Sequence, residues 1–173
     1  MVVFVAQEAT EIVSVAADNT FDNPDFVASH MLDDTTKFWA SCKRAPHSEV
    51  RLTLAPSTRP ASLEIVFHNS YRPRTLSVDT SCDDGATWEL HAVNVPIQRN
   101  LFRLAFKNAG EFEASLVRLT LDGAAEYHGI AQCKVYAHRP LARCSNAMVA
   151  CDHFSDVTNP QHVLHLANQP TPL

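Results

Sequence analysis

Apolar and polar side chains alternate with a period of two in short segments along residues 1–138. Leu63, Ile65 and Phe67 would lie on one face of a strand and Glu64 on the other. Because successive side chains of a strand point to opposite faces, this pattern is typical of antiparallel sheets that bury one face. Many such strands predict an all-β sandwich or jelly roll of about eight or nine strands. The segments expected to form strands are residues 2–5, 12–17, 50–54, 63–67, 75–80, 88–95, 102–107, 116–121 and 130–136.

The alternation stops after residue 138. We therefore expect one β-sandwich domain over residues 1–138 and a C-terminal extension over residues 139–173 that packs on the domain or on a partner. Asn159-Pro160 predicts the start of one short helix in that extension, because Asn is a good N-cap and Pro suits the first helical position. Within the domain, Asp83-Asp84-Gly85 predicts a hairpin turn, because glycine supplies the positive φ that such turns need.

Composition excludes several classes of function. The chain has only four glycines, too scattered for the glycine-rich motifs of dinucleotide, phosphate-loop or serine-hydrolase sites. The formal net charge is -5 and no basic stripe is present, which argues against a nucleic-acid partner. The densest basic spots, Lys43-Arg44 and Arg72 with Arg74, fit solvated loops as well as a binding patch. Apolar runs reach only about five residues, whereas a membrane span needs ~20.

The five cysteines are odd in number and have no metal-ligand spacing, so we expect reduced thiols and a cytoplasmic protein. Cys133 alternates in phase with Ala131 and Val135, which places it on an inward face. No motif joins a nucleophile to a base, so the protein is expected not to be an enzyme.

Two loops carry residues suited to binding. His68, Asn69, Tyr71, Arg72 and Arg74 connect two expected strands and combine an aromatic ring with guanidinium, amide and imidazole groups. This chemistry suits a sugar ring or an acidic peptide; the alternative is a connecting loop whose tyrosine caps the core.

The second loop places the oxygens of Asp33, Asp34 and Thr36 just before Phe38 and Trp39. Ca²⁺ prefers six to eight such oxygen ligands, so a calcium site is one reading. The other is a polar turn in which Phe38 or Trp39 plugs the end of the sandwich.

Several motifs occur in the order found in discoidin-type domains, which share the galactose-binding jelly-roll fold. The chain resembles them over about residues 10–138, in the segments 12–17, 26–34, 38–41, 76–88, 117–121 and 130–136. Two departures weaken the family's calcium site: the Asp33–Trp39 loop is one residue short, and Gln132 stands where many members have glutamate. The resemblance suggests instead that the Lys37 ammonium sits at the cation position, bound by loop carbonyls.

Within that superfamily the chain resembles the intracellular members. Trp39-x-Ser41 followed by Pro46-His47, and Ser70-Tyr71 before residues 75–81, are similar to two groups. One is the small discoidin-fold subunit of the intraflagellar transport B particle, and the other is the Doc domain of the anaphase-promoting ubiquitin ligase. The resemblance implies a protein-interaction subunit, cytoplasmic or ciliary, with a Rab-like small GTPase or a ligase scaffold as partner. The alternative from another class is a carbohydrate-binding module, in which Pro73-Arg74 would contact the sugar.

Overall fold

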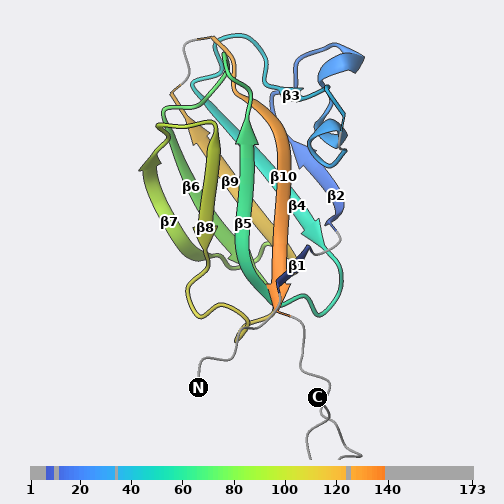
Figure 1. Ribbon diagram of the computed structural model, residues 1–173, viewed down its shortest axis with the longest axis vertical. Coiled ribbons are helices and arrows are strands. Elements are labelled where there is room, and N and C mark those ends of the chain that lie inside the picture. The colour runs from blue at the N-terminus through green and yellow to red at the C-terminus, as the bar shows by residue number, and fades with distance from the viewer. Residues whose placement is uncertain (1–6, 10–11, 34, 124–125, 139–173) are drawn as a thin grey trace, which may run out of the picture. The chain divides into compact units, whose positions relative to one another are not determined.

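The computed structural model describes residues 7–9, 12–33, 35–123 and 126–138. They form two five-stranded antiparallel sheets packed face to face (Figure 1). The first sheet has the order β1 (Gln7–Ala9), β10 (Gly129–His138), β5 (Pro60–Phe67) and β8 (Leu101–Ala105), and β3 (Trp39–Ala40) also pairs with β10. The second has the order β2 (Ile12–Ala17), β4 (His47–Leu54), β9 (Leu116–Asp122), β6 (Thr75–Ser81) and β7 (Glu89–Pro96). The predicted all-β jelly-roll sandwich is therefore confirmed.

The expected strands from residue 12 to residue 136 are all present, with small differences at their ends. The expected strand at residues 2–5 lies outside the described residues, and the short β1 and β3 were not expected. β8 ends at Ala105 rather than at residue 107. The reason is that the backbone N–H of Lys107 donates to His91 Nδ1 at 3.1 Å instead of continuing the ladder.

The inner faces of the two sheets form one apolar core. Val117, Leu119 and Leu121 of β9 are fully buried, as are Leu63 and Ile65 of β5. Both sets are those that the alternation placed inward. Burial of one such side chain contributes about 1.5–3 kcal/mol, so this pairing of sheets is the main source of stability.

Cys133 lies in this core opposite Ile65, with only 2% of its surface exposed. Burial raises the pKa of its thiol to about 12. The predicted inward position is confirmed, and the thiol stays protonated and unreactive at neutral pH.

The hairpin between β6 and β7 is built on the expected turn. Asp84 and Gly85 both have positive φ, at 54° and 92°. The Asp83 carboxylate accepts hydrogen bonds from the Thr87 backbone N–H at 2.8 Å, from the Thr87 hydroxyl at 2.7 Å and from the Ser81 hydroxyl at 2.7 Å. These bonds, chiefly those from Thr87, lower the pKa of Asp83 to about 2.

The long connection from β2 to β3 contains two short 3₁₀ helices, η1 (Pro24–Phe26) and η2 (Ala28–Met31). Asn23 caps η1 by accepting from the Asp25 backbone N–H, and Pro24 follows as the first helical residue. Trp39 then closes that end of the core: it is fully buried, and its Nε1–H donates to Thr20 Oγ1 at 3.1 Å.

The described sandwich ends at His138. The expected C-terminal extension over residues 139–173, including the helix after Asn159-Pro160, lies outside the described residues and stays a prediction. Within the described ranges, no helix has both the length and the apolar character needed to cross a membrane.

Candidate ligand-binding site at one end of the sandwich

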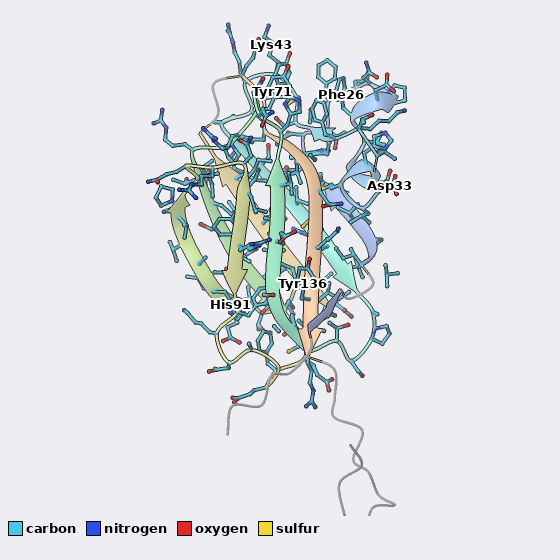
Figure 2. All side chains as sticks on the ribbon, in the orientation of Figure 1. Phe26, Asp33, Lys43, Tyr71, His91 and Tyr136 are labelled. Atoms are coloured by element: carbon cyan, nitrogen blue, oxygen red, sulfur yellow. The ribbon has the colours of Figure 1, made fainter. Side chains whose placement is uncertain are left out.

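Five loops meet at one end of the sandwich, and we call this end the rim. Its described residues are 18–33, 35–38, 41–46, 68–74, 97–100, 123 and 126–128. Backbone hydrogen bonds join these loops: Ser41 donates to the His128 carbonyl at 2.8 Å, and Gly129 donates to the Tyr71 carbonyl at 2.7 Å. Figure 2 shows Phe26, Lys43 and Tyr71 at this end, with His91 and Tyr136 toward the other.

Six rings form a closed circuit within the rim. Each ring contacts the next, with centroids 4.1–5.8 Å apart, in the order Phe21, Phe26, Phe38, His68, Tyr71, Tyr127 and back to Phe21. A pocket of about 120 Å³ opens beside them, lined by Phe21, Phe26, Ala40, Tyr71 and Tyr127. Mutual contacts hold the rings, so they offer a rigid apolar surface at low entropic cost.

Gly129 allows the loop that carries His68 and Tyr71 to lie close to β10. A Cβ on Gly129 would lie 2.9 Å from the Tyr71 Cβ and 3.1 Å from the His68 Cβ. The His68 backbone N–H also donates to the Gly129 carbonyl at 2.9 Å. The residue at the start of β10 must therefore lack a side chain if the 68–71 loop is to lie so close to it.

The His68 imidazole stacks on two rings that also contact each other. Its centroid is 4.1 Å from that of Phe38 and 4.8 Å from that of Tyr71, with interplanar angles of 18° and 20°. Burial lowers the pKa of His68. The ring is therefore neutral at neutral pH, which suits a role as part of an apolar wall.

The other predicted residues of this loop form a polar margin beside the pocket. Arg72 Nη1 donates to Asn100 Oδ1 at 3.1 Å, and Asn100 in turn donates to Asn69 Oδ1. Arg74 packs along Gly123, where an added Cβ would be 3.1 Å from the Arg74 Cβ. The structure thus gathers all five predicted residues at one end, and their contact with a ligand stays a prediction.

Four aromatic residues of the pocket circuit were not predicted as binding residues: Phe21, Phe26, Phe38 and Tyr127. A sequence signal was present, because Phe21 and Phe26 occur in a segment rich in Asp, Asn and Pro, where large apolar side chains are unusual. Asn100 was also missed, since nothing local marks it as a partner of Arg72.

The predicted calcium loop has no cluster of ligands among the described residues. Asp33 and Thr36 are exposed, and Asp34 lies outside the described ranges. Nowhere in those ranges do three Asp, Glu, His or Cys side chains come together as metal ligands. The Lys37 ammonium is bound by the Asp25 carboxylate at 3.0 Å, a carboxylate and not a loop carbonyl. Calcium at Asp33, Asp34 and Thr36 stays a prediction.

Comparison with known proteins gave no match to a family model and none to a curated protein. Solved structures do match. A chitosan-binding module from a chitosanase/glucanase of Paenibacillus sp. IK-5 is 18% identical, with a TM-score of 0.63 over 72% of this chain and 94% of the module. An F5/8 type C domain of Bacteroides fragilis is 13% identical, with a TM-score of 0.66 over 78% of this chain and 98% of that one. A pectin-binding carbohydrate-binding module is 21% identical, with a TM-score of 0.60 over 73% and 91%.

These likenesses show the fold. The described chain is a jelly roll of the discoidin, or galactose-binding-like, type, as its sequence motifs indicated.

Proposed function

We propose that the chain is a carbohydrate-binding module whose ligand occupies the aromatic pocket of the rim. The observation that carries the proposal is that four rings of the closed circuit line that pocket: Phe21, Phe26, Tyr71 and Tyr127. Sugars present an apolar C–H face that packs on aromatic rings, while a few polar groups at the margin fix orientation. Arg72, Asn69 and Asn100 supply such groups beside Tyr71. The fold shared with modules that are described as binding chitosan and pectin supports the same reading.

The size of the pocket limits what it holds. The pocket is small, with a volume of about 120 Å³. It therefore accepts part of one sugar residue, and the remainder of a longer glycan would lie across the rim loops.

A hydroxyl beside an imidazole can act as a nucleophile with its base, but the two such pairs in the described residues favour binding over catalysis. Among the described residues, Ser48 Oγ lies 2.8 Å from His128 Nδ1, and Thr80 Oγ1 lies 2.8 Å from His91 Nε2. All four of these residues are buried, so a substrate reaches neither hydroxyl.

A glycan array followed by titration calorimetry tests the proposal. We expect a glycan ligand whose affinity falls about two- to tenfold in Tyr127→Ala from stacking alone, since stacking on an aromatic ring contributes about 0.5–1.5 kcal/mol beyond area burial. Tyr136→Ala is the matched control, because this half-buried tyrosine lies on β10 away from the rim. No glycan ligand, or equal binding by the Tyr127 and Tyr136 variants, would overturn the proposal.

A second candidate is a protein-interaction subunit, of the intraflagellar-transport or Doc kind that the sequence resembles. The observation in its favour is a set of exposed apolar side chains on the two edge strands β7 and β8: Leu90, Val93 and Leu101 are 43%, 57% and 45% exposed. Exposed apolar groups on neighbouring edges suit a protein partner. Affinity capture from cells with wild type and Val93→Asp tests it: recovery of the same partners by both variants counts against this surface.

A further inference from the structure

The arginines of the chain fall into two groups. Four are neutralised by carboxylates outside the rim: Arg51 with Glu49 at 2.5 Å, Arg59 with Glu113 at 3.3 Å, Arg103 with Glu64 at 2.7 Å and Arg118 with Asp79 at 3.1 Å. The other four described arginines have no carboxylate partner in the described residues, and all are exposed on rim loops: Arg44, Arg72, Arg74 and Arg99. Although the net charge of the chain is -5, uncompensated guanidinium groups are thus concentrated beside the aromatic pocket.

Hydrogen bonds connect the loops that carry these arginines. The Ile97 backbone N–H donates to the Arg74 carbonyl at 3.0 Å, which places the 97–100 loop against the 72–74 loop. On the Tyr127 side, the Arg44 backbone N–H donates to the Glu126 carbonyl at 2.6 Å. The pocket therefore has cationic loops on two sides.

Arg72 is the arginine most clearly arranged for a ligand. It follows Tyr71 of the pocket, and a neutral amide, Asn100, holds its guanidinium in place. Asn69 holds Asn100 in turn. A carboxylate partner would have cancelled the charge; the amide fixes the geometry and leaves the charge available. A guanidinium has five N–H donors, so an edge remains for a second, bidentate partner.

Two acidic groups of the rim have cationic partners: Glu126 pairs with Lys43 at 3.0 Å, and Asp25 pairs with Lys37 at 3.0 Å. Asp18, Asp22 and Asp33 have no lysine or arginine partner in the described residues, and all three belong to the β2–β3 connection. These uncompensated carboxylates therefore lie on a different loop from Arg72, Arg74 and Arg99.

We infer that this rim selects an acidic saccharide, in which an apolar sugar face packs in the aromatic pocket while a ring carboxylate binds the Arg72 guanidinium. This inference rests on the proposed function and names the ligand class of the same site. Arg74 and Arg99 would contact further carboxylates along a uronate chain. Bidentate guanidinium–carboxylate pairs are among the stronger and more specific hydrogen-bonded contacts in proteins.

The test compares an acidic oligosaccharide with uncharged counterparts. Titration calorimetry of the full chain would use oligogalacturonate, the same oligomer as its methyl ester, and a neutral galacto-oligosaccharide. We expect the acid to bind at least tenfold more tightly than the ester, since loss of a charged hydrogen-bond partner costs about that much. This preference should fall as ionic strength rises.

Arg72→Gln should abolish the preference for the acid, so that the acid and the ester bind with equal affinity. Arg59→Gln, a neutralised arginine outside the rim, is the matched control and should bind as wild type. Equal binding of acid and ester, or a preference that survives Arg72→Gln, would overturn the inference. Binding to neutral glycans alone would overturn it and leave the proposed function standing, whereas failure to bind any glycan refutes both.

Discussion

Gly129→Ala tests whether close backbone packing builds the aromatic pocket. The added Cβ would meet the Cβ atoms of Tyr71 and His68 at 2.9 Å and 3.1 Å. Carbon atoms in favourable contact lie about 3.5–4.0 Å apart, so these groups must separate by about 0.5–1 Å. Both obstructing atoms are Cβ atoms, which rotamer changes cannot move. The backbone of the 68–71 loop must therefore shift, and its hydrogen bonds to Gly129, at 2.7 Å and 2.9 Å, must lengthen.

Overpacking of this kind costs about 1–3 kcal/mol. For a domain of this size that is a fall in Tm of roughly 3–10 °C, measurable by thermal denaturation. Affinity for the glycan should fall as well, because Tyr71 lines the pocket. The double variant Tyr71→Gly with Gly129→Ala removes the closer obstructing Cβ, so we expect the two changes to couple by about 1–2 kcal/mol. A fall in Tm below 1 °C for Gly129→Ala, or strictly additive effects in the double variant, would refute this reasoning.

Three further outcomes are expected. Burial lowers the pKa of His91 and of His128 in the folded state, so below pH 6.5 the unfolded chain binds protons that the folded chain does not. The contribution of these two histidines to the free energy of unfolding is fully present above pH 6.5 and should be lost as the pH falls, by up to about 1.4 kcal/mol per pH unit for each histidine. Equal urea midpoints at pH 7 and pH 5 would contradict this. Leu119→Ala, at a fully buried position, should lower the free energy of unfolding by about 2–5 kcal/mol in urea titration, and a loss below 1 kcal/mol would mean that this part of the core is not closely packed. The Asp83 carboxyl should titrate near pH 2 by NMR, and a midpoint near 4 would show that its bonds to Thr87 do not persist in solution.

Alternation in the sequence predicted the sheets because it is a local property. A residue inside a strand points to one face or the other, so the apolar set of β9 or β5 can be recognised from neighbours two positions away. The turn at Gly85 was predictable for the same reason, because a tight turn is formed by four or five adjacent residues and requires a positive φ at this position. The Asp33 loop marks the limit of such reasoning, because whether its oxygens bind calcium depends on groups contributed from elsewhere.

The loop proposed for binding was chosen from the sequence, but the residues of other loops that contact it were not predicted, and its contact with a ligand stays a prediction. The 68–74 segment was recognised from its mixture of residue types, and the structure brings Asn100, Phe21 and Tyr127 to it from other loops. Asn100 and Tyr127 are not marked by their own surroundings in the sequence, whereas Phe21 lies in a segment rich in Asp, Asn and Pro. The burial of His91 and His128 was likewise not anticipated, because each contacts a hydroxyl on a different strand.

The amino-acid sequence by itself determined that this chain forms strands, which of their faces turn inward, and which loop offers binding chemistry. The tertiary structure alone decided which aromatic rings form the pocket and which of the described arginines have no carboxylate partner. Ring contacts and charge neutralisation are set by distances between atoms that lie as far apart in the chain as Phe21 and Tyr127. Those distances exist only once the strands have paired in their particular order.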